Sequence, residues 1–129
     1  MGESIIKKKT FEFALETIKI FKLLQKQNEY VLSKQLLRSG TSIGAKVREA
    51  LNAESTADFI HKFSIAQKEC DETLYWLELL MESGFVDRTI LQIASTEAAE
   101  ILKIIKSIII TSKSKLQHKT FNSKLIIHN

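Results

Sequence analysis

The sequence predicts an all-α protein built as an antiparallel, up-and-down four-helix bundle. Proline is absent from all 129 residues and glycine occurs only 4 times, so almost nothing interrupts a helix. Apolar residues make up 44% of the chain, and they recur at the three- and four-residue spacings of amphipathic helices. This length is typical of one domain, and we expect a single bundle.

The first helix is expected from about Thr10 to Gln27, with a break at residues 28–30. Phe11 and Leu15 broaden its apolar side. The predicted core stripe consists of Ala14, Ile18, Phe21 and Leu24.

The second helix is expected from Ser33, a suitable N-cap, to about Asn52. Its middle is rich in small residues, including Gly40 and Gly44. Each glycine costs a helix about 1 kcal/mol relative to alanine. We therefore expect a neighbouring helix to approach closely here. The predicted apolar face consists of Leu36, Ile43, Val47 and Ala50.

The third helix has the clearest pattern. Ser55 or Thr56 is the expected N-cap, Asp58 lies in the first turn, and Gly84 fits the position just after the C-terminus. Its apolar positions alternate spacings of four and three over three heptads, as in long bundle helices. These positions are Phe59, Phe63, Ala66, Cys70, Thr73, Leu77 and Leu80.

The fourth helix is expected to begin after Asp87, its N-cap, and to end near Ser112. Its core stripe is Leu91, Ala94, Ala98, Ile101, Ile105 and Ile108. A second apolar side is formed by Leu102, Ile104, Ile109 and Ile110. Every helix of a four-helix bundle is peripheral, so a helix with two apolar sides predicts that another subunit covers one of them.

Charge divides the chain into a bundle, residues 1–112, and a basic C-terminal tail, residues 113–129. Residues 1–100 hold 13 Lys and Arg against 15 Asp and Glu, a net of −2, whereas residues 101–129 hold six lysines and no acid. Such a basic end indicates contact with an anionic partner. The alternative interpretation is a solvated, disordered tail, or one that docks on a partner through its apolar end, residues 125–127.

The chain is expected to be cytoplasmic and not bound to a membrane. A single cysteine, Cys70, gives no intramolecular disulfide. The apolar run from Ile101 to Ile110 is too short to span a bilayer and is interrupted by two lysines.

Residues for catalysis or metal binding are not evident. His61, His118 and His128 are far apart, and the Glu-x-x-His motifs of di-iron bundles are missing. Cys70 lies on the heptad seam, where a small core side chain is expected. Residues 40–44 lack the lysine and serine that end a phosphate-binding P-loop. We expect no enzyme, no metal and no cofactor.

Polar residues crowd the second helix. One interpretation is an ion-pair cluster with the third helix that fixes the register of the bundle. The other is an exposed basic strip that contacts phosphates, which fits Lys46 and Arg48 better than Arg38. The predicted structural cluster is Arg38, Ser39, Ser42, Glu49, Glu69 and Glu72.

Two segments make the sequence resemble a known family. The first is RSGTSIGA at residues 38–45, followed by Glu49 and Ala50, and the second is ECDETLYWLELL at residues 69–80. Across roughly residues 10–112, the chain resembles the four-helix-bundle proteins encoded in bacterial 23S rRNA intervening sequences. That family is similar to the accessory variability determinant of diversity-generating retroelements, a basic pentamer implicated in binding nucleic acid and reverse transcriptase.

The resemblance implies a homopentameric ring, which would account for the second apolar side of the fourth helix. It implies no agreed activity. The chain departs from the family at Lys46, where asparagine is usual. The lysine either changes a buried polar contact or adds positive charge to a channel or face.

Two functions are therefore expected. The first is a non-catalytic oligomer that binds nucleic acid, RNA in particular, through backbone phosphates, in a sequence-tolerant and salt-dependent way. The second is a scaffold whose oligomer docks another protein. The candidate phosphate-binding residues are Lys46, Arg48, Lys103, Lys106, Lys113, Lys115, Lys119 and Lys124.

Overall fold

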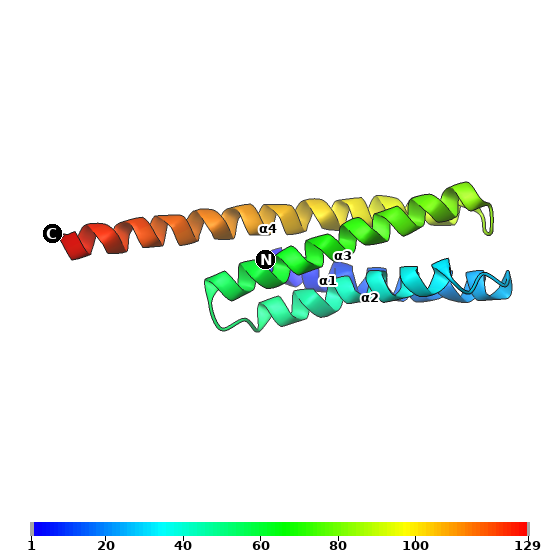
Figure 1. Cartoon of the computed structure of the whole chain (residues 1–129), viewed down its shortest axis with the longest axis horizontal. Coiled ribbons are helices and arrows are strands. Elements are labelled where there is room, and N and C mark those ends of the chain that lie inside the picture. The colour runs from blue at the N-terminus through cyan, green and yellow to red at the C-terminus, as the bar shows by residue number, and fades with distance from the viewer. Residues whose placement is uncertain (1, 129) are drawn as a thin grey trace.

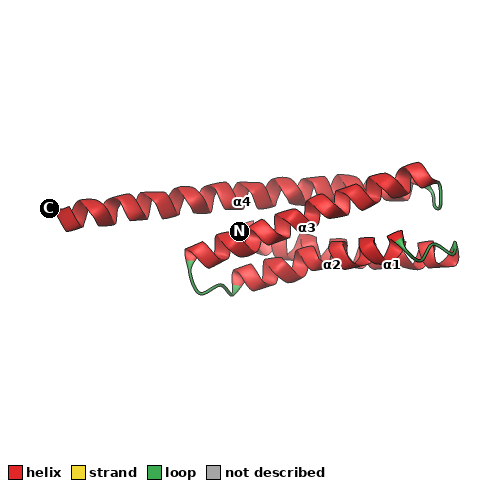
Figure 2. Cartoon of the chain, in the orientation of Figure 1, coloured by secondary structure: helices red, strands yellow, loops and turns green. Residues whose placement is uncertain are grey.

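The computed structural model describes residues 2–128, and it describes side chains for residues 5–122. Four helices and no strand occur within these residues, joined by short loops (Figure 2). They are α1 (Gly2–Lys26), α2 (Leu32–Leu51), α3 (Thr56–Ser83) and α4 (Arg88–His128). Successive helices lie side by side and antiparallel, and α1 also contacts α4 (Figure 1). The predicted all-α class and number of helices are confirmed.

One continuous core runs along the inside of the four helices. On α3 the buried residues are Phe63, Ala66, Cys70, Thr73, Leu77 and Leu80, as predicted. The prediction was wrong for one expected core residue on α3 and one on α4. Phe59 and Ile108 are half-buried, and the neighbouring Ile60 and Ile109 take their places in the core.

The core face of α1 differs from the prediction. Phe11 and Leu15, expected to broaden the apolar side that faces the core, are 52% and 47% exposed, and Ala14, Ile18 and Phe21 are only half-buried. The prediction was wrong because α1 carries apolar residues on two sides and threonines on its core side. The buried residues are Ile6, Thr10, Phe13, Thr17, Ile20 and Leu24.

The two threonines on α1 face the two glycines of α2. A Cβ added to Gly40 would lie 2.7 Å from side-chain atoms of Thr17, whereas one added to Gly44 would lie 3.4 Å from Thr10. The Thr10 and Thr17 hydroxyls donate to the carbonyls of Ile6 and Phe13, so neither needs a partner on α2. The predicted close approach is confirmed, and α1 is the helix that makes it.

Most helix ends follow the sequence signals. Ser55 caps α3, with its hydroxyl oxygen 3.1 Å from the Asp58 amide, and Gly84 follows α3 with a φ of 75°. The Asp87 carboxylate accepts from the Thr89 amide at 2.9 Å.

The start of α2 is the exception, because Ser33 is not its N-cap. The Glu29 carboxylate accepts hydrogen bonds from the amides of Val31, at 2.9 Å, and of Leu32 and Ser33. It thereby satisfies three amides that have no acceptor within the helix. Glu29 is only 6% exposed, and the Ser33 hydroxyl donates to its carbonyl.

Two helices are longer than expected. α1 begins at Gly2 rather than near Thr10, and α4 continues from Ser112 to His128. Residues 113–128 contain neither glycine nor proline, so nothing in the sequence stops the helix. At about 1.5 Å per residue, the 41 residues of α4 span about 60 Å. Its C-terminal part projects past the α2–α3 turn (Figure 1).

None of the helices in the described residues combines the length and the apolar character that a membrane crossing requires.

Candidate nucleic-acid interface

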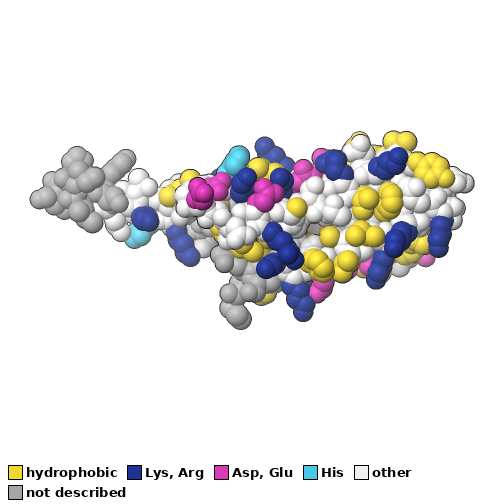
Figure 3. Space-filling model, turned by 90° about the horizontal axis from the view of Figure 1, so that it is seen from below, with side chains coloured by type: hydrophobic (Ala, Val, Ile, Leu, Met, Phe, Trp, Pro, Cys, Tyr) yellow, Lys and Arg dark blue, Asp and Glu magenta, His cyan; other side chains and the backbone are white. Residues whose placement is uncertain are grey.

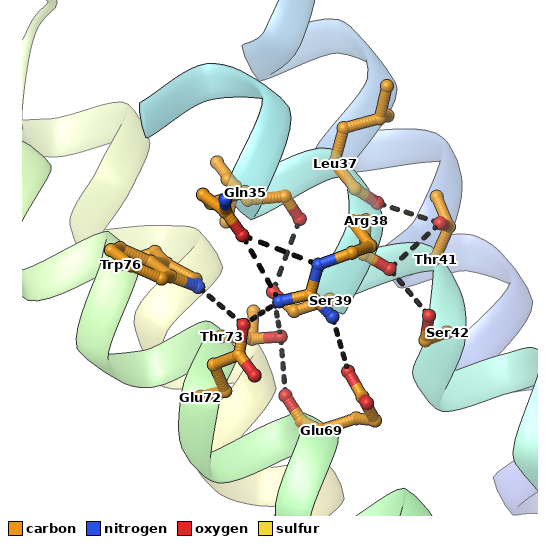
Figure 4. A network of polar contacts seen from close by, with 11 residues as sticks. Gln35, Leu37, Arg38, Ser39, Thr41, Ser42, Glu69, Glu72, Thr73 and Trp76 are labelled. Atoms are coloured by element: carbon orange, nitrogen blue, oxygen red, sulfur yellow. Dashed lines mark hydrogen bonds and ion pairs between the residues drawn. The ribbon is translucent and has the colours of Figure 1, made fainter. Parts of the chain in front are cut away.

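The predicted polar cluster joins α2 to α3 through Arg38 (Figure 4). Its guanidinium lies 3.4 Å from a Glu69 carboxylate oxygen, pairs closely with the Glu72 carboxylate, and lies 3.3 Å from the side-chain oxygen of Gln35. The Arg38 side chain is 49% exposed, so water screens these pairs. Arg38 is therefore both ion-paired and accessible.

Three members of this network were not predicted. The Trp76 indole donates to Glu72 at 2.9 Å, and the Thr73 hydroxyl lies 2.9 Å from the Ser39 hydroxyl inside the core. Gln35 is the third, and it lies one turn before Arg38. Thr73 had a signal, since a polar residue on an apolar seam needs a hydrogen-bond partner. Trp76 and Gln35 had a weaker signal, their one-turn spacing from Glu72 and Arg38.

Ser42 and Glu49 do not contact the carboxylates of this network. The Ser42 hydroxyl donates to the backbone carbonyl of Arg38. The Glu49 carboxylate pairs instead with Lys46, at 3.1 Å, and with Lys62 of α3, at 3.5 Å. The hydrogen bond from Lys46, helped by the charges of Lys46 and Lys62, holds the pKa of Glu49 below its usual range.

The two α2 residues expected to be free for phosphates differ from each other. Lys46 is half-buried and engaged with Glu49. Arg48 is exposed, and its guanidinium carbon lies 5.5 Å from the centre of the Phe11 ring on α1. Arg48 can therefore offer its charge to a ligand, whereas Lys46 would first have to leave a carboxylate.

The lysines of α4 are the most accessible positive charges among the candidates. Among the described side chains, no ion pair involves Lys103, Lys106 or the three lysines beyond Ser112. The exposed lysines of this helix are Lys103, Lys106, Lys113, Lys115 and Lys119. Lys124 lies beyond the described side chains. α4 therefore brings five of the predicted residues onto one helix, away from Lys46 and Arg48.

A groove of about 540 Å³ between α1 and α4 has the opposite charge. Glu12, Glu16, Glu97 and Glu100 line it with Lys9 and Lys19, and Lys9 pairs with Glu100 at 2.9 Å. Partial burial and the nearby carboxylates of Glu16, Glu100 and Glu12 raise the pKa of Glu97. This side of the bundle repels phosphate, which leaves the exposed lysines of α4 as the better candidates.

Cys70 and His61 lie where the sequence predicts, in the core and on the surface. Cys70 is buried, its sulfur lies 3.2 Å from the Ala98 carbonyl oxygen, and burial raises the pKa of its thiol to about 12. His61 is exposed. Among the described residues, no three His, Cys, Asp or Glu side chains are placed to hold a metal ion.

Large apolar side chains remain on the outside of the bundle. On the face formed by α1 and α2, hydrophobic side chains gather between lysines and arginines (Figure 3). Phe11 and Leu15 belong to the outer side of α1, and Ile93 and Ile110 of α4 are 53% and 69% exposed. The second apolar side predicted for α4 is therefore present at Ile110, while Ile109 is in the core.

Comparisons with known proteins agree with the resemblance in the sequence. No curated protein matches the chain. A crystal structure of a protein of unknown function, from the S23 ribosomal protein family of Bacteroides thetaiotaomicron, is 47% identical with a TM-score of 0.82. The match covers 84% of this chain and 98% of that one. A family model described as 23S rRNA-intervening sequence protein matches residues 2–107, which stops short of Lys113. The chain therefore belongs to the 23S rRNA-intervening sequence protein family.

Proposed function

We propose that this chain is a non-catalytic, oligomeric protein that associates with nucleic acid, RNA in particular, through backbone phosphates. The observation that carries the proposal is the lysine-rich part of α4. Five exposed lysines lie between Lys103 and Lys119, and residues 101–129 contain no acid. Lysines without acidic neighbours attract phosphate at long range and release its counterions on binding.

RNA is favoured over other polyanions by the family, whose description names the 23S rRNA-intervening sequence. The shape of α4 also fits, because its C-terminal part projects beyond the bundle and can be approached from several sides (Figure 1). Phe121 is the one exposed aromatic side chain in the described part of this segment. We therefore expect phosphate contacts, rather than base stacking, to provide most of the affinity.

Assembly into a homopentamer is part of the proposal. The exposed apolar side chains of α1 and α4, among them Phe11 and Ile93, are ones that an oligomer interface would cover. A symmetric ring would provide that cover and would present five basic helices together. Five weak contacts then add their effects through high local concentration.

The test is fluorescence-anisotropy binding of a structured RNA to two variants with equal loss of charge. One carries Lys113→Gln, Lys115→Gln and Lys119→Gln, and the control carries Lys22→Gln, Lys26→Gln and Lys34→Gln at exposed positions of the body. We expect the first variant to bind at least tenfold more weakly near 0.1 M salt and the control to stay near wild type. Equal weakening of both would mean that α4 is not the interface, and no binding by wild type would refute the proposal.

A protein scaffold is the second candidate, and the apolar residues 125–127 near the end of the sequence favour it. A chain ending at Ser112 separates the two functions. If it loses RNA affinity, the nucleic-acid proposal is supported. If it keeps RNA affinity and instead loses a co-purifying protein, the scaffold is supported.

A further inference from the structure

Four of the five exposed lysines of α4 lie in two rows on different sides of the helix. Each residue advances an α-helix by about 100°. Lys106 and Lys113 are seven residues apart and therefore differ by only about 20° in direction. Lys115 and Lys119 are four residues apart, about 40°, and point about 160° and 120° away from Lys113. We call Lys106 and Lys113 the first row, and Lys115 and Lys119 the second row. All four side chains are exposed.

The surface between the rows carries no charge along residues 107–122, and most of its side chains are polar. Ile110 and Phe121, both exposed, also lie between the rows, nearer the first row. Ser114, His118 and Asn122 are exposed there, and the Asn122 amide nitrogen lies 3.1 Å from a ring nitrogen of His118. On the inner side, Leu116 is half-buried against the bundle beside the α2–α3 turn. The outer side of this segment is therefore an uncharged, mostly polar strip with positive charge along both edges.

We propose that this segment of α4 binds double-stranded nucleic acid, with the two rows contacting phosphates of opposite strands. This inference rests on the proposed function and adds the form of the ligand. A duplex groove has a phosphate backbone along each wall, so it matches two rows, whereas a single strand has one backbone and matches one. An α-helix with its side chains is about 10–12 Å across, close to the width of about 12 Å of the B-form major groove.

The segment has few aromatic side chains on which bases could stack, which supports the same ligand. Proteins that bind single strands without sequence preference combine basic grooves with several aromatic platforms. Phe121 is the one exposed aromatic residue in the described part of the segment, and the strip offers hydrogen-bonding groups instead. Duplex DNA and duplex RNA share the paired backbones. They differ in their grooves, because the deep groove of A-form RNA is narrow.

The test relocates two lysines on α4 and keeps the net charge of the protein constant. A rearranged variant carries Lys115→Gln and Lys119→Gln together with Gln117→Lys and Thr120→Lys, all at exposed positions. The new lysines lie on the side of the first row, so net charge is constant and the second row is lost. Circular dichroism checks that the helix is intact. Fluorescence anisotropy then measures binding of both proteins to a duplex DNA, a duplex RNA and a single strand of equal phosphate number.

We expect the rearranged variant to bind at least one of the duplexes about tenfold more weakly near 0.1 M salt, since phosphate contacts are lost, and to bind the single strand as wild type does. The duplex whose binding weakens shows whether the ligand is duplex DNA or duplex RNA. Unchanged binding to both duplexes would overturn the inference while leaving phosphate binding intact. Equal weakening on duplex and single strand would also overturn it. If wild type binds none of the three, the proposed function itself fails.

Discussion

Thr17 and Gly40 show how single side chains set the distance between α1 and α2. The glycine leaves room for the threonine, whose hydroxyl is already satisfied by the Phe13 carbonyl. A polar residue can then be buried here without a partner on the other helix. The small residues in the middle of α2 are thereby explained by packing.

Gly40→Ala should destabilise the fold by about 1–2 kcal/mol, because the cost of overpacking exceeds the gain of about 1 kcal/mol in helix propensity. The new Cβ would lie 2.7 Å from the Thr17 side chain. Gly44→Ala is the matched control and should be neutral or stabilising, since its Cβ finds ordinary contact at 3.4 Å. Urea denaturation measures both. Equal effects would contradict this explanation, and adding Thr17→Ala should restore the stability of Gly40→Ala.

Glu29→Ala should lower the free energy of unfolding by about 1–2 kcal/mol, the usual effect of losing a helix cap. Three amides at the start of α2 would lose their acceptor. Glu54→Ala, at an exposed position in the loop between α2 and α3, serves as the control. Chemical denaturation gives the comparison, and a loss no larger than that of the control would show that the Glu29 carboxylate does not act as a cap.

Cys70 should resist thiol reagents at pH 8 while the protein is folded. Its thiol is buried and its pKa is raised to about 12, so little reactive thiolate forms. Reaction with a chromogenic disulfide should follow the unfolding transition in urea. Rapid labelling of the folded protein would show that the α3–α4 contact opens locally.

Whole helices show what the sequence can and cannot predict. The heptad pattern and the Ser55 and Gly84 signals place α3 correctly, because a long stripe has one consistent direction. On α1 the apolar residues lie on two sides, so the sequence does not show which side faces the core. The Glu29 cap was missed because glutamate three residues before a helix is not one of the usual N-caps. The end of α4 was missed because the charge changes at residue 113 while the helix continues.

Only part of the candidate site could be predicted, because a sequence shows charge more clearly than it shows which charged side chains pair. Exposed lysines on α4 can be expected from their charge pattern alone. An ion-pair cluster of Arg38 with Glu69 and Glu72 was one of the two interpretations of the sequence, whereas the pairing of Lys46 with Glu49 was not expected. Lys46 and Glu49 lie one turn apart on α2, and their spacing alone does not show whether the lysine pairs with the glutamate or extends into solvent.

The groove between α1 and α4 should make stability depend on pH. The pKa of Glu97 is raised above 4.5 in the folded state. The folded state therefore binds more protons than the unfolded state between 4.5 and the raised pKa, and stability falls as pH rises through that interval. Glu97→Gln should match the stability of wild type at low pH and exceed it at neutral pH.

Glu49 should make stability change with pH in the opposite direction. Its pKa is lowered by Lys46 and Lys62, so its contribution is present at neutral pH and is lost as pH falls below 4.5. The Glu49 carboxylate is exposed to solvent, which makes this effect small. Thermal unfolding of Glu97→Gln and Glu49→Gln from pH 3 to 7 measures both, and a gain at neutral pH for Glu49→Gln would contradict the assignment.

At the level of the whole molecule, much of the positive charge of α4 lies beyond the core of the bundle. Among the described side chains of α4, the last core residue is Ile109, and Lys113, Lys115 and Lys119 follow it. Phe11 and Ile93 remain exposed on the chain and are among the apolar residues that assembly would cover. Binding should then depend on both the charge of α4 and the number of subunits.

Assembly should be visible in the mass of the protein. Light scattering after size-exclusion chromatography should give about five times the 14.7 kDa of one chain. Phe11→Glu should reduce that mass, because it places charge on an apolar contact, while Lys22→Glu serves as the exposed control. A monomer at micromolar concentration would contradict the pentamer but not phosphate binding by the single chain.

The most direct test of the central claim is the salt dependence of RNA binding by the full chain, measured by fluorescence anisotropy from 50 to 300 mM salt. Contact between the α4 lysines and phosphates predicts that the logarithm of affinity falls linearly with the logarithm of salt concentration. The slope should be shallower by about 2 in the variant with Lys113→Gln, Lys115→Gln and Lys119→Gln. A flat dependence, or the same slope in both proteins, would contradict the claim.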